Sequence, residues 1–308
     1  MLRRLVPATA AAALLLAGAT GCSAQQASAA DCEPTLHPGA LSDSVTVTGS
    51  FGEAPEVSIP DDLRVLTTQR TVVEQAADRS NLVEDQSLVG VNMAFFDQAS
   101  GERMYESPGF AAADQSAEFL LVSDDASNPL SESLRCAAPG DRVVVAMAPD
   151  EGGQLAMQLG GDPESPLVAV IDVVSAGPLA AEGPVRGLPN GFPAVVTNDE
   201  GRPGIVLPPR SAPEGTTAAV RVEGDGAEVG ADDNVIAQVL SVGWDGTVQT
   251  NSWESGLTGL GNEQQVSQSG NTFRNQLTGA KVGSQLVIIE NEADAEPRVV
   301  VVDIIGVG

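Results

Sequence analysis

Histidine and cysteine are scarce in this sequence. His37 is the only histidine among 308 residues, and the three cysteines show no Cys/His spacing typical of a metal site. Zinc sites and histidine-based catalytic triads need several such side chains close together. The glycines at 259–261 lack the Lys-Ser/Thr pair of a phosphate-binding loop. We therefore expect no metal site and no cofactor.

Basic and aromatic residues are also few. The chain has 15 Lys and Arg against 42 Asp and Glu, a formal net charge of −27. Such a surface repels nucleic acid and anionic lipid headgroups, so no nucleic-acid partner is expected. The acidity fits solubility, or an acidic docking site. Aromatics make up 3%, but the 42% hydrophobic content can build a core, and 33 glycines and 20 prolines indicate many turns and a β-rich fold.

The N-terminus has no apolar run long enough to cross a bilayer. Residues 10–17 are apolar, follow Arg3 and Arg4, and lead to Ala-Thr-Gly-Cys at 19–22. This order is typical of a secretory signal and resembles the bacterial lipobox. It predicts a signal peptide at 1–21 and a lipid anchor on Cys22, which places the protein outside the cytoplasm on the outer face of the cell membrane. The alternative is an ordinary cleaved signal with an incidental cysteine.

Cys32 and Cys136 remain if Cys22 carries lipid. In an oxidising compartment a disulfide between them is the natural pairing. It would close a loop of roughly 100 residues, worth about 4–5 kcal/mol in the chain-entropy model. The alternatives are two free thiols or an intermolecular bridge from Cys32.

The rest of the chain looks duplicated. Residues 165–174 are similar to 296–305, residues 139–145 to 282–288, and residues 85–93 to 232–240, in the same order. Proline-rich residues divide the two halves. The predicted organisation is a flexible tether at 22–43, a first domain at 44–177, a Pro/Gly linker at 178–192 and a second domain at 193–308.

Both halves read mostly as strands, with one short helix each. β-Branched or alternating runs bounded by turn residues predict strands at 57–59, 71–73, 88–96, 143–147, 168–174, 205–207, 218–222, 235–242, 285–289 and 299–305. Helices are expected at 130–137 and 272–277. The predicted fold class is α+β, with a small, mostly antiparallel sheet and one short helix in each half.

The second half resembles a known family. Residues 222–235 carry a Gly-Asp-Gly turn between two strands, 243–247 an Asp-Gly turn, 251–256 the segment after it, and 272–284 a helix with a Val-Gly-Ser exit. This order resembles the FK506-binding-protein (FKBP) type of peptidyl-prolyl cis-trans isomerase. The resemblance implies two tandem FKBP-like domains, each a curved sheet around one short helix. The first half resembles the family through its likeness to the second.

The resemblance implies a folding function. The family lowers the barrier to X–Pro rotation, about 18–20 kcal/mol, in an aromatic-walled pocket with a Tyr hydroxyl and an Asp. The expected activity is prolyl isomerisation of exported unfolded or proline-containing polypeptides. The alternative is an inactive FKBP-like module that binds peptides or proteins.

The family's pocket residues are largely replaced here. Carried over position by position, the strand Tyr, the Phe-Asp pair, the floor Trp and the late-strand Phe fall at Val239, Gln249, Thr250, Phe273 and Val300. In the first half the corresponding positions are about Ala94, Met104, Tyr105 and Leu130. These residues are the candidate pocket, and none is assigned a catalytic role.

Overall fold

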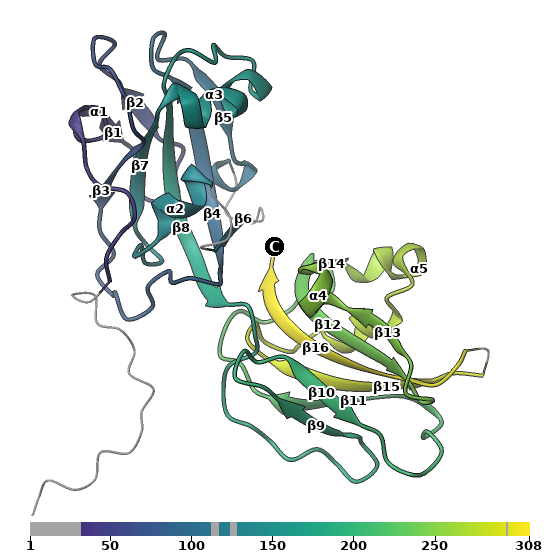
Figure 1. Cartoon of the computed structure of the whole chain (residues 1–308). Coiled ribbons are helices and arrows are strands. Elements are labelled where there is room, and N and C mark those ends of the chain that lie inside the picture. The colour runs from purple at the N-terminus through teal and green to yellow at the C-terminus, as the bar shows by residue number, and fades with distance from the viewer. Residues whose placement is uncertain (1–31, 112–116, 124–127, 294) are drawn as a thin grey trace, which may run out of the picture.

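The computed structural model describes residues 32–111, 117–123, 128–293 and 295–308. They form two units, each built on a six-stranded antiparallel sheet with few short helices (Figure 1). The expected pair of mostly antiparallel sheets is therefore present. We call the unit on the first sheet domain 1 and the unit on the second domain 2.

The two sheets have the same strand order. In domain 1 the order is β3-β7-β8-β4-β5, and β6 also pairs with β4. In domain 2 it is β11-β15-β16-β12-β13, and β14 also pairs with β12. Counted from each domain's first strand, the two orders are identical. The strands of the two sheets are β3 (Gln69–Glu74), β4 (Ser87–Asp97), β5 (Arg103–Glu106), β6 (Glu118–Val122), β7 (Arg142–Met147) and β8 (Leu167–Pro178), then β11 (Gly215–Val222), β12 (Val235–Gly243), β13 (Val248–Asn251), β14 (Thr258–Gly261), β15 (Gln285–Asn291) and β16 (Arg298–Val307).

A one-residue slip separates the sequence alignment of the halves from the structural one. Asn92 pairs with Asp172 across the first sheet, and Gln238 pairs with Asp303 across the second. The sequence match of 85–93 with 232–240 instead aligns Asn92 with Val239. Both final strands carry an extra residue opposite this region, and because the two sheets share this bulge, it does not account for the slip.

Short helices cover one face of each sheet. In domain 1 these are α2 (Pro129–Leu134) and α3 (Pro149–Gln158), whose apolar residues join the core beneath them. In domain 2 the 3₁₀ helix η3 (Thr272–Gln276) places Phe273 in the core. The expected single helix per half is thus present, but α3 is an addition. Other short helical elements are α4 (Ser252–Ser255), α5 (Val266–Ser269) and the 3₁₀ helices η1 (Pro108–Phe110) and η2 (Glu263–Gln265).

A small hairpin and the chain before it cover the other face of each sheet. Helix α1 (Ala40–Ser44) and the hairpin β1 (Thr46–Thr48)–β2 (Glu56–Ser58) lie on domain 1, with Leu41 fully buried. The hairpin β9 (Ala194–Thr197)–β10 (Pro203–Val206) lies on domain 2, where Leu188 and Phe192 also pack on the sheet. The predicted tether therefore overlaps the fold at Leu41, and the predicted linker at Leu188 and Phe192. Isolated apolar residues among turn-forming residues make no periodic pattern, so this packing was not predicted from the sequence.

A buried aspartate ties each covering segment to its sheet. In domain 1, Asp172 forms an ion pair with Arg142 at 2.6 Å and accepts the Gly52 N–H at 2.7 Å. In domain 2, Asp303 accepts the Ala181 N–H at 2.9 Å. Its second partner is the neutral Gln285, whose Nε2 donates at 2.7 Å. The same strand position thus carries the same anchor in both domains, but only domain 1 has a cation in direct contact.

Asp303, which has no cation in direct contact, has a raised pKa. Burial raises the pKa of Asp303 to about 6, and its hydrogen bonds to Ala181 and Gln285 and the charge of Arg221 offset this only in part. Arg221 has no direct contact with Asp303 and donates its Nη1 to Gln285 at 2.6 Å. The ionised form of Asp303 is therefore disfavoured in the folded protein.

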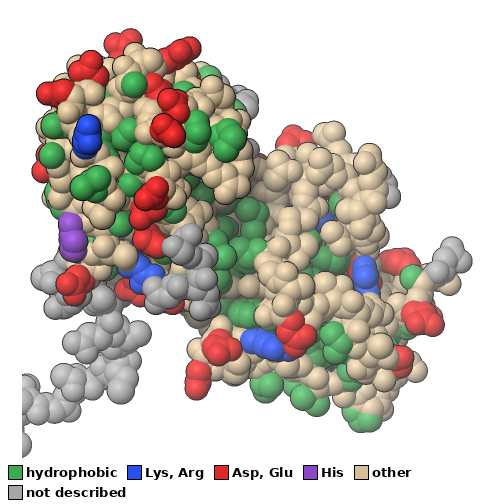
Figure 2. Space-filling model, turned by 45° about the horizontal axis from the view of Figure 1, so that its top comes forward, with side chains coloured by type: hydrophobic (Ala, Val, Ile, Leu, Met, Phe, Trp, Pro, Cys, Tyr) green, Lys and Arg blue, Asp and Glu red, His purple; other side chains and the backbone are tan. Residues whose placement is uncertain are grey.

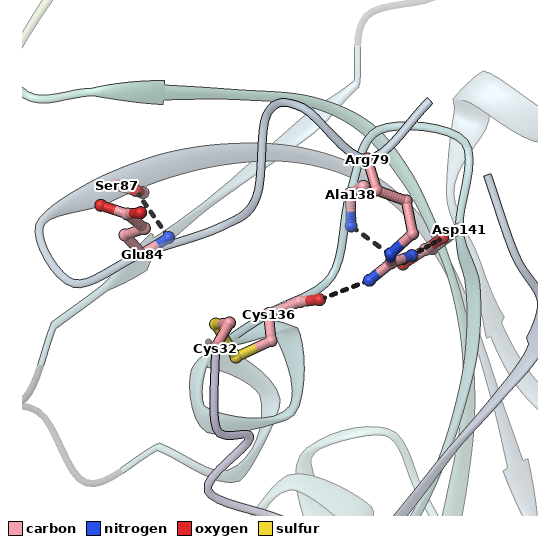
Figure 3. Close-up of a disulfide and its surroundings, with 7 residues drawn as sticks. All are labelled: Cys32, Arg79, Glu84, Ser87, Cys136, Ala138 and Asp141. Atoms are coloured by element: carbon pink, nitrogen blue, oxygen red, sulfur yellow. Dashed lines mark hydrogen bonds and ion pairs between the residues drawn. A yellow bond between two sulfur atoms is a disulfide. The ribbon is translucent and has the colours of Figure 1, made fainter. Parts of the chain in front are cut away.

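A disulfide fixes the first described residues to domain 1. Cys32 is bonded to Cys136, just after α2 (Figure 3). Arg79 braces the same turn, since its guanidinium donates to the Cys136 carbonyl and pairs with Asp141, both at 2.8 Å. The predicted signal peptide and Cys22 lie outside the described residues. Within the described part of the chain, no helix has both the length and the apolar character needed to cross a bilayer.

Acidification should stabilise domain 2. The folded pKa of Asp303, about 6, lies above its ordinary value of 3.8, so its stabilising contribution is present at low pH and is lost as pH rises through 6. Between pH 7 and pH 5 this amounts to about 1 kcal/mol. Urea unfolding followed by tryptophan fluorescence measures it, because both tryptophans, Trp244 and Trp253, lie in domain 2.

The Asp303→Asn variant isolates this effect from the other carboxylates. Its stability should gain about 1 kcal/mol less than the parent protein between pH 7 and pH 5. Asp172→Asn, at the equivalent position of domain 1, should leave the response of domain 2 unchanged. Equal pH responses in the parent and Asp303→Asn would contradict the assignment.

Candidate functional site

The candidate pocket of domain 2 is filled by its own side chains. Val239, Phe273 and Val300 belong to one core cluster, and their exposed fractions are 2%, 3% and 0%. Phe273 reaches this cluster from η3, while Val239 and Val300 come from the two central strands β12 and β16. The three residues do converge, but they contact the core, and the volume that a proline ring would take is occupied.

The other two candidates of domain 2 lie elsewhere. Gln249 and Thr250 are exposed on β13, at the edge of the sheet. The Gln249 Oε1 accepts a hydrogen bond from the Ser241 hydroxyl at 3.2 Å. The five predicted residues are therefore divided between core and surface. The family's Phe-Asp pair can fold over a pocket, whereas two short polar side chains on an edge strand remain in solvent.

A polar group closes the side of this core. The Arg298 guanidinium lies 5.8 Å from the centre of the Phe273 ring and donates to Glu290 at 2.7 Å. Glu290 also accepts the Thr272 hydroxyl. Sequence analysis missed this group, since its members come from three separate segments. Glu290 thus accepts from both Arg298 and Thr272, and the group covers the edge of η3.

Domain 1 has a different arrangement around its single tyrosine. Tyr105 on β5 donates its hydroxyl to Glu118 on β6, and the Ser107 hydroxyl donates to the other oxygen of the same carboxylate. The Ser107 Oγ in turn accepts the Met93 N–H at 2.8 Å. The ring of Tyr105 lies 5.9 Å from that of Phe95, centre to centre. Ser107, Glu118 and Phe95 were not predicted from the sequence.

The Tyr105 hydroxyl is held in its protonated form. Burial raises the pKa of Tyr105, and the neighbouring Glu118 carboxylate raises it further, while a hydrogen bond with Ser107 opposes these effects. The hydroxyl is therefore a hydrogen-bond donor, and its partner is a carboxylate that can also accept from elsewhere. No proton transfer is needed for such a pair to orient a ligand.

Half-buried apolar side chains surround this polar pair. A bulge leaves Met104 without a partner in the β4–β5 ladder, and both Met104 and Tyr105 pack on the helix-bearing side of the sheet. We define the Tyr105 surface by six residues: Met104, Tyr105, Glu118, Leu120, Leu155 and Leu159. The last two come from α3 and the residue after it, and all four aliphatic side chains are partly exposed.

The first-half candidates are only partly placed as predicted. Met104 and Tyr105 belong to the Tyr105 surface, and Leu130 lies in the core beneath it. Ala94 is wrong, because it lies in the cluster on the opposite, hairpin-covered face. The equivalent of Val239 is Met93, one residue earlier, because Val239 pairs with Val302 and Met93 with Ile171, at the same position of the last strand. In the described part of the chain, no group of three His, Cys, Asp or Glu side chains is arranged to hold a metal ion.

The main effect of replacing Phe273 should be on the stability of domain 2. We expect Phe273→Ala to destabilise domain 2 by about 3–5 kcal/mol, because it removes a buried ring and leaves a cavity. Urea unfolding followed by tryptophan fluorescence measures the loss. Thr250→Ala, an exposed candidate of the same predicted pocket, should change stability by less than about 0.5 kcal/mol. A Phe273→Ala protein as stable as its parent would mean that the ring lines an open pocket.

Comparisons with known proteins found similarity to solved structures alone. No family model matches the chain, and no curated protein does. Among solved structures, the three FKBP domains of wheat FKBP73 are similar at 14% identity and a TM-score of 0.34, over 78% of this chain and 94% of that one. A peptidyl-prolyl cis-trans isomerase from Pseudomonas syringae is similar at 16% and 0.29, over 36% and 75%. The N-terminal domain of Arabidopsis thaliana FKBP42 is similar at 11% and 0.31, over 41% and 98%. These structures are FKBP-type, and at such scores nothing about activity follows from them.

Proposed function

We propose that this chain is an FKBP-like polypeptide-binding protein that works outside the cytoplasm and binds through domain 1. The observation that carries the proposal is the Tyr105 surface. It combines partly exposed aliphatic side chains with a hydroxyl donor and a carboxylate acceptor. An extended polypeptide offers the matching chemistry, because apolar side chains alternate with backbone carbonyl and N–H groups.

The filled core of domain 2 favours binding by domain 1 over prolyl isomerisation by both domains. Its equivalent space is filled by Phe273, Val239 and Val300, and the polar residues beside Phe273 pair with each other. Rotation about an X–Pro bond needs a dry pocket that holds the proline and desolvates its carbonyl. Domain 2 therefore acts as a structural partner in this proposal, and binding is assigned to domain 1.

Prolyl isomerisation by domain 1 is the second candidate function. The Tyr105–Glu118 pair favours it, since the family resemblance implies a Tyr hydroxyl beside an acidic residue at the pocket. Phe95 supplies one aromatic wall next to Tyr105. The remaining walls are aliphatic, and an aliphatic surface holds a proline ring with less contact area than stacked aromatic rings do.

The proposed location is the outer face of the cell membrane, through lipid on Cys22. The Cys32–Cys136 disulfide supports an oxidising compartment, because such bonds persist outside the cytoplasm. The proposed partners are exported, unfolded or proline-containing polypeptides. Metabolic labelling with a fatty acid tests the anchor, and Cys22→Ser should abolish the label.

A pair of assays on the full chain separates binding from catalysis. We expect the protein to slow the aggregation of a reduced, unfolded client without accelerating its proline-limited refolding phase. Leu155→Ser should weaken binding about five-fold, the effect of losing a half-buried apolar side chain. Met157→Ser is the matched control, because Met157 lies on the same helix but is 60% exposed.

The outcomes divide the candidates. Accelerated refolding that is lost in Tyr105→Phe would establish isomerisation by domain 1 and displace the binding-only proposal. If the parent and Leu155→Ser slow aggregation equally, the binding site lies outside the Tyr105 surface. Neither activity in the parent protein would overturn both candidates.

A further inference from the structure

Three arginines of this acidic chain come together at one place on domain 2. An open depression of about 500 Å³ lies between the segment 185–195 and the sheet edge. Three arginines line it, Arg186, Arg210 and Arg221, and no Asp or Glu does. Acidic residues outnumber basic ones by 42 to 15 in the whole chain. A lining with three cations and no carboxylate is therefore the reverse of the composition around it.

The wall of the depression is built into the fold. Leu188, Phe192 and Val195 line it and also pack on the core cluster over β15 and β16. The Arg221 carbonyl accepts the Arg186 N–H at 2.6 Å, which joins the segment to the edge strand β11. Trp244 donates its indole N–H to the Arg210 carbonyl at 2.7 Å and fixes that loop. The arginines thus project from a fixed frame.

Two of the three charges remain without a carboxylate partner in the described residues. Arg186 is paired with Glu223, which lies outside the lining. Arg221 donates to the neutral Gln285 at 2.6 Å, and that residue leads on to Asp303. For the Arg210 guanidinium, the described residues supply neither a hydrogen bond nor an ion pair. Arg210 therefore offers an unpaired positive charge to a ligand, and Arg221 offers a second one that it shares at longer range with Asp303.

We propose that this depression is a binding site for a phosphoryl group. A guanidinium presents its N–H donors in a planar fork that matches phosphate oxygens, and it stays charged at any physiological pH. A dianionic phosphate can engage two arginines at once and matches their charge. The apolar residues Leu188 and Phe192 suit the uncharged body of a phosphate ester. The site is separate from the Tyr105 surface and goes beyond the function proposed for domain 1.

The net charge of −27 opposes this binding only weakly at short range. At physiological ionic strength the Debye length is about 8 Å, so distant carboxylates are largely screened. Contacts with Arg210 and Arg221 act at hydrogen-bond distance. A flat anionic membrane meets more of the acidic surface than a small ion does, and is therefore repelled more strongly. The phosphoryl group could come from a lipid headgroup or from a soluble phosphate ester, and an experiment distinguishes these two sources.

Trp244 provides a local reporter. In the full chain carrying Cys22→Ser and Trp253→Phe, Trp244 is the only tryptophan, and it bonds the loop that carries Arg210. Titration with inorganic phosphate should give a saturable fluorescence change that sodium chloride of equal ionic strength does not reproduce. Arg210→Gln should weaken phosphate binding about ten-fold, because it removes the fork and leaves the backbone in place.

Arg202→Gln is the matched control. It removes the same charge from the neighbouring hairpin, but Arg202 pairs with Glu254 and does not line this depression. Its phosphate affinity should equal that of the parent. The melting temperature of Arg210→Gln should also equal that of the parent, which separates loss of binding from loss of fold. An absent or chloride-like response, or equal weakening in both variants, would overturn the proposal.

Vesicles identify the source of the phosphoryl group. Phosphatidylglycerol-containing vesicles that retain the protein through Arg210, when phosphatidylcholine vesicles do not, would assign the site to an anionic headgroup. Phosphate binding without vesicle retention would assign it to a soluble phosphate ester. Vesicle retention that is unchanged in Arg210→Gln, together with no phosphate response, would contradict the site altogether.

Discussion

A buried aspartate in the last strand of each sheet connects the sheet to the chain segment that precedes it and covers one of its faces. Asp172 holds Gly52, and Asp303 holds Ala181, by a backbone N–H in both cases. A buried carboxylate is costly unless hydrogen bonds and charges compensate it, so its partners are closely specified. Arg142 compensates Asp172 directly, whereas Asp303 has a hydrogen bond from Gln285 and the more distant charge of Arg221. These contacts hold the covering segments against their sheets.

This anchoring leaves one face of each sheet for function, and the two domains use it differently. In domain 1 a bulge at Met104, helix α3 and the Tyr105–Glu118 pair keep a partly exposed, mixed surface. In domain 2 the same face is closed by Phe273 and its polar neighbours. Duplication therefore preserved the strand order and the anchors while the helix-bearing faces diverged. The domains also meet: Gly306 of β16 lies against Leu88 and Phe119 of domain 1, where Figure 2 shows hydrophobic side chains between the two bodies.

The sequence predicts the repeated strands well, because β-branched runs such as 143–147 and 299–305 are distinctive and bounded by turn residues. It also predicts the short helices that carry Leu130 and Phe273. Helix α3 was missed, since Gly152 and Gly153 lower its helix propensity while the fold tolerates them in close contacts with Met147 and Pro163. The Tyr105 surface was found only in part. Glu118 and Leu120 join it through the pairing of β6 with β4, and Leu155 joins it from α3, and local periodicity records neither of these contacts.

The assignment of binding to domain 1 and of a filled core to domain 2 is the claim on which the functional account depends. Methyl-detected NMR of the full chain, titrated with an unfolded proline-containing polypeptide, tests it most directly. The account predicts that signals of Met104, Leu120, Leu155 and Leu159 shift together and saturate, while those of Val239, Leu277 and Val300 stay in place. Shifts centred on the Val239 and Val300 methyls, with the Leu155 and Leu159 signals unmoved, would contradict it.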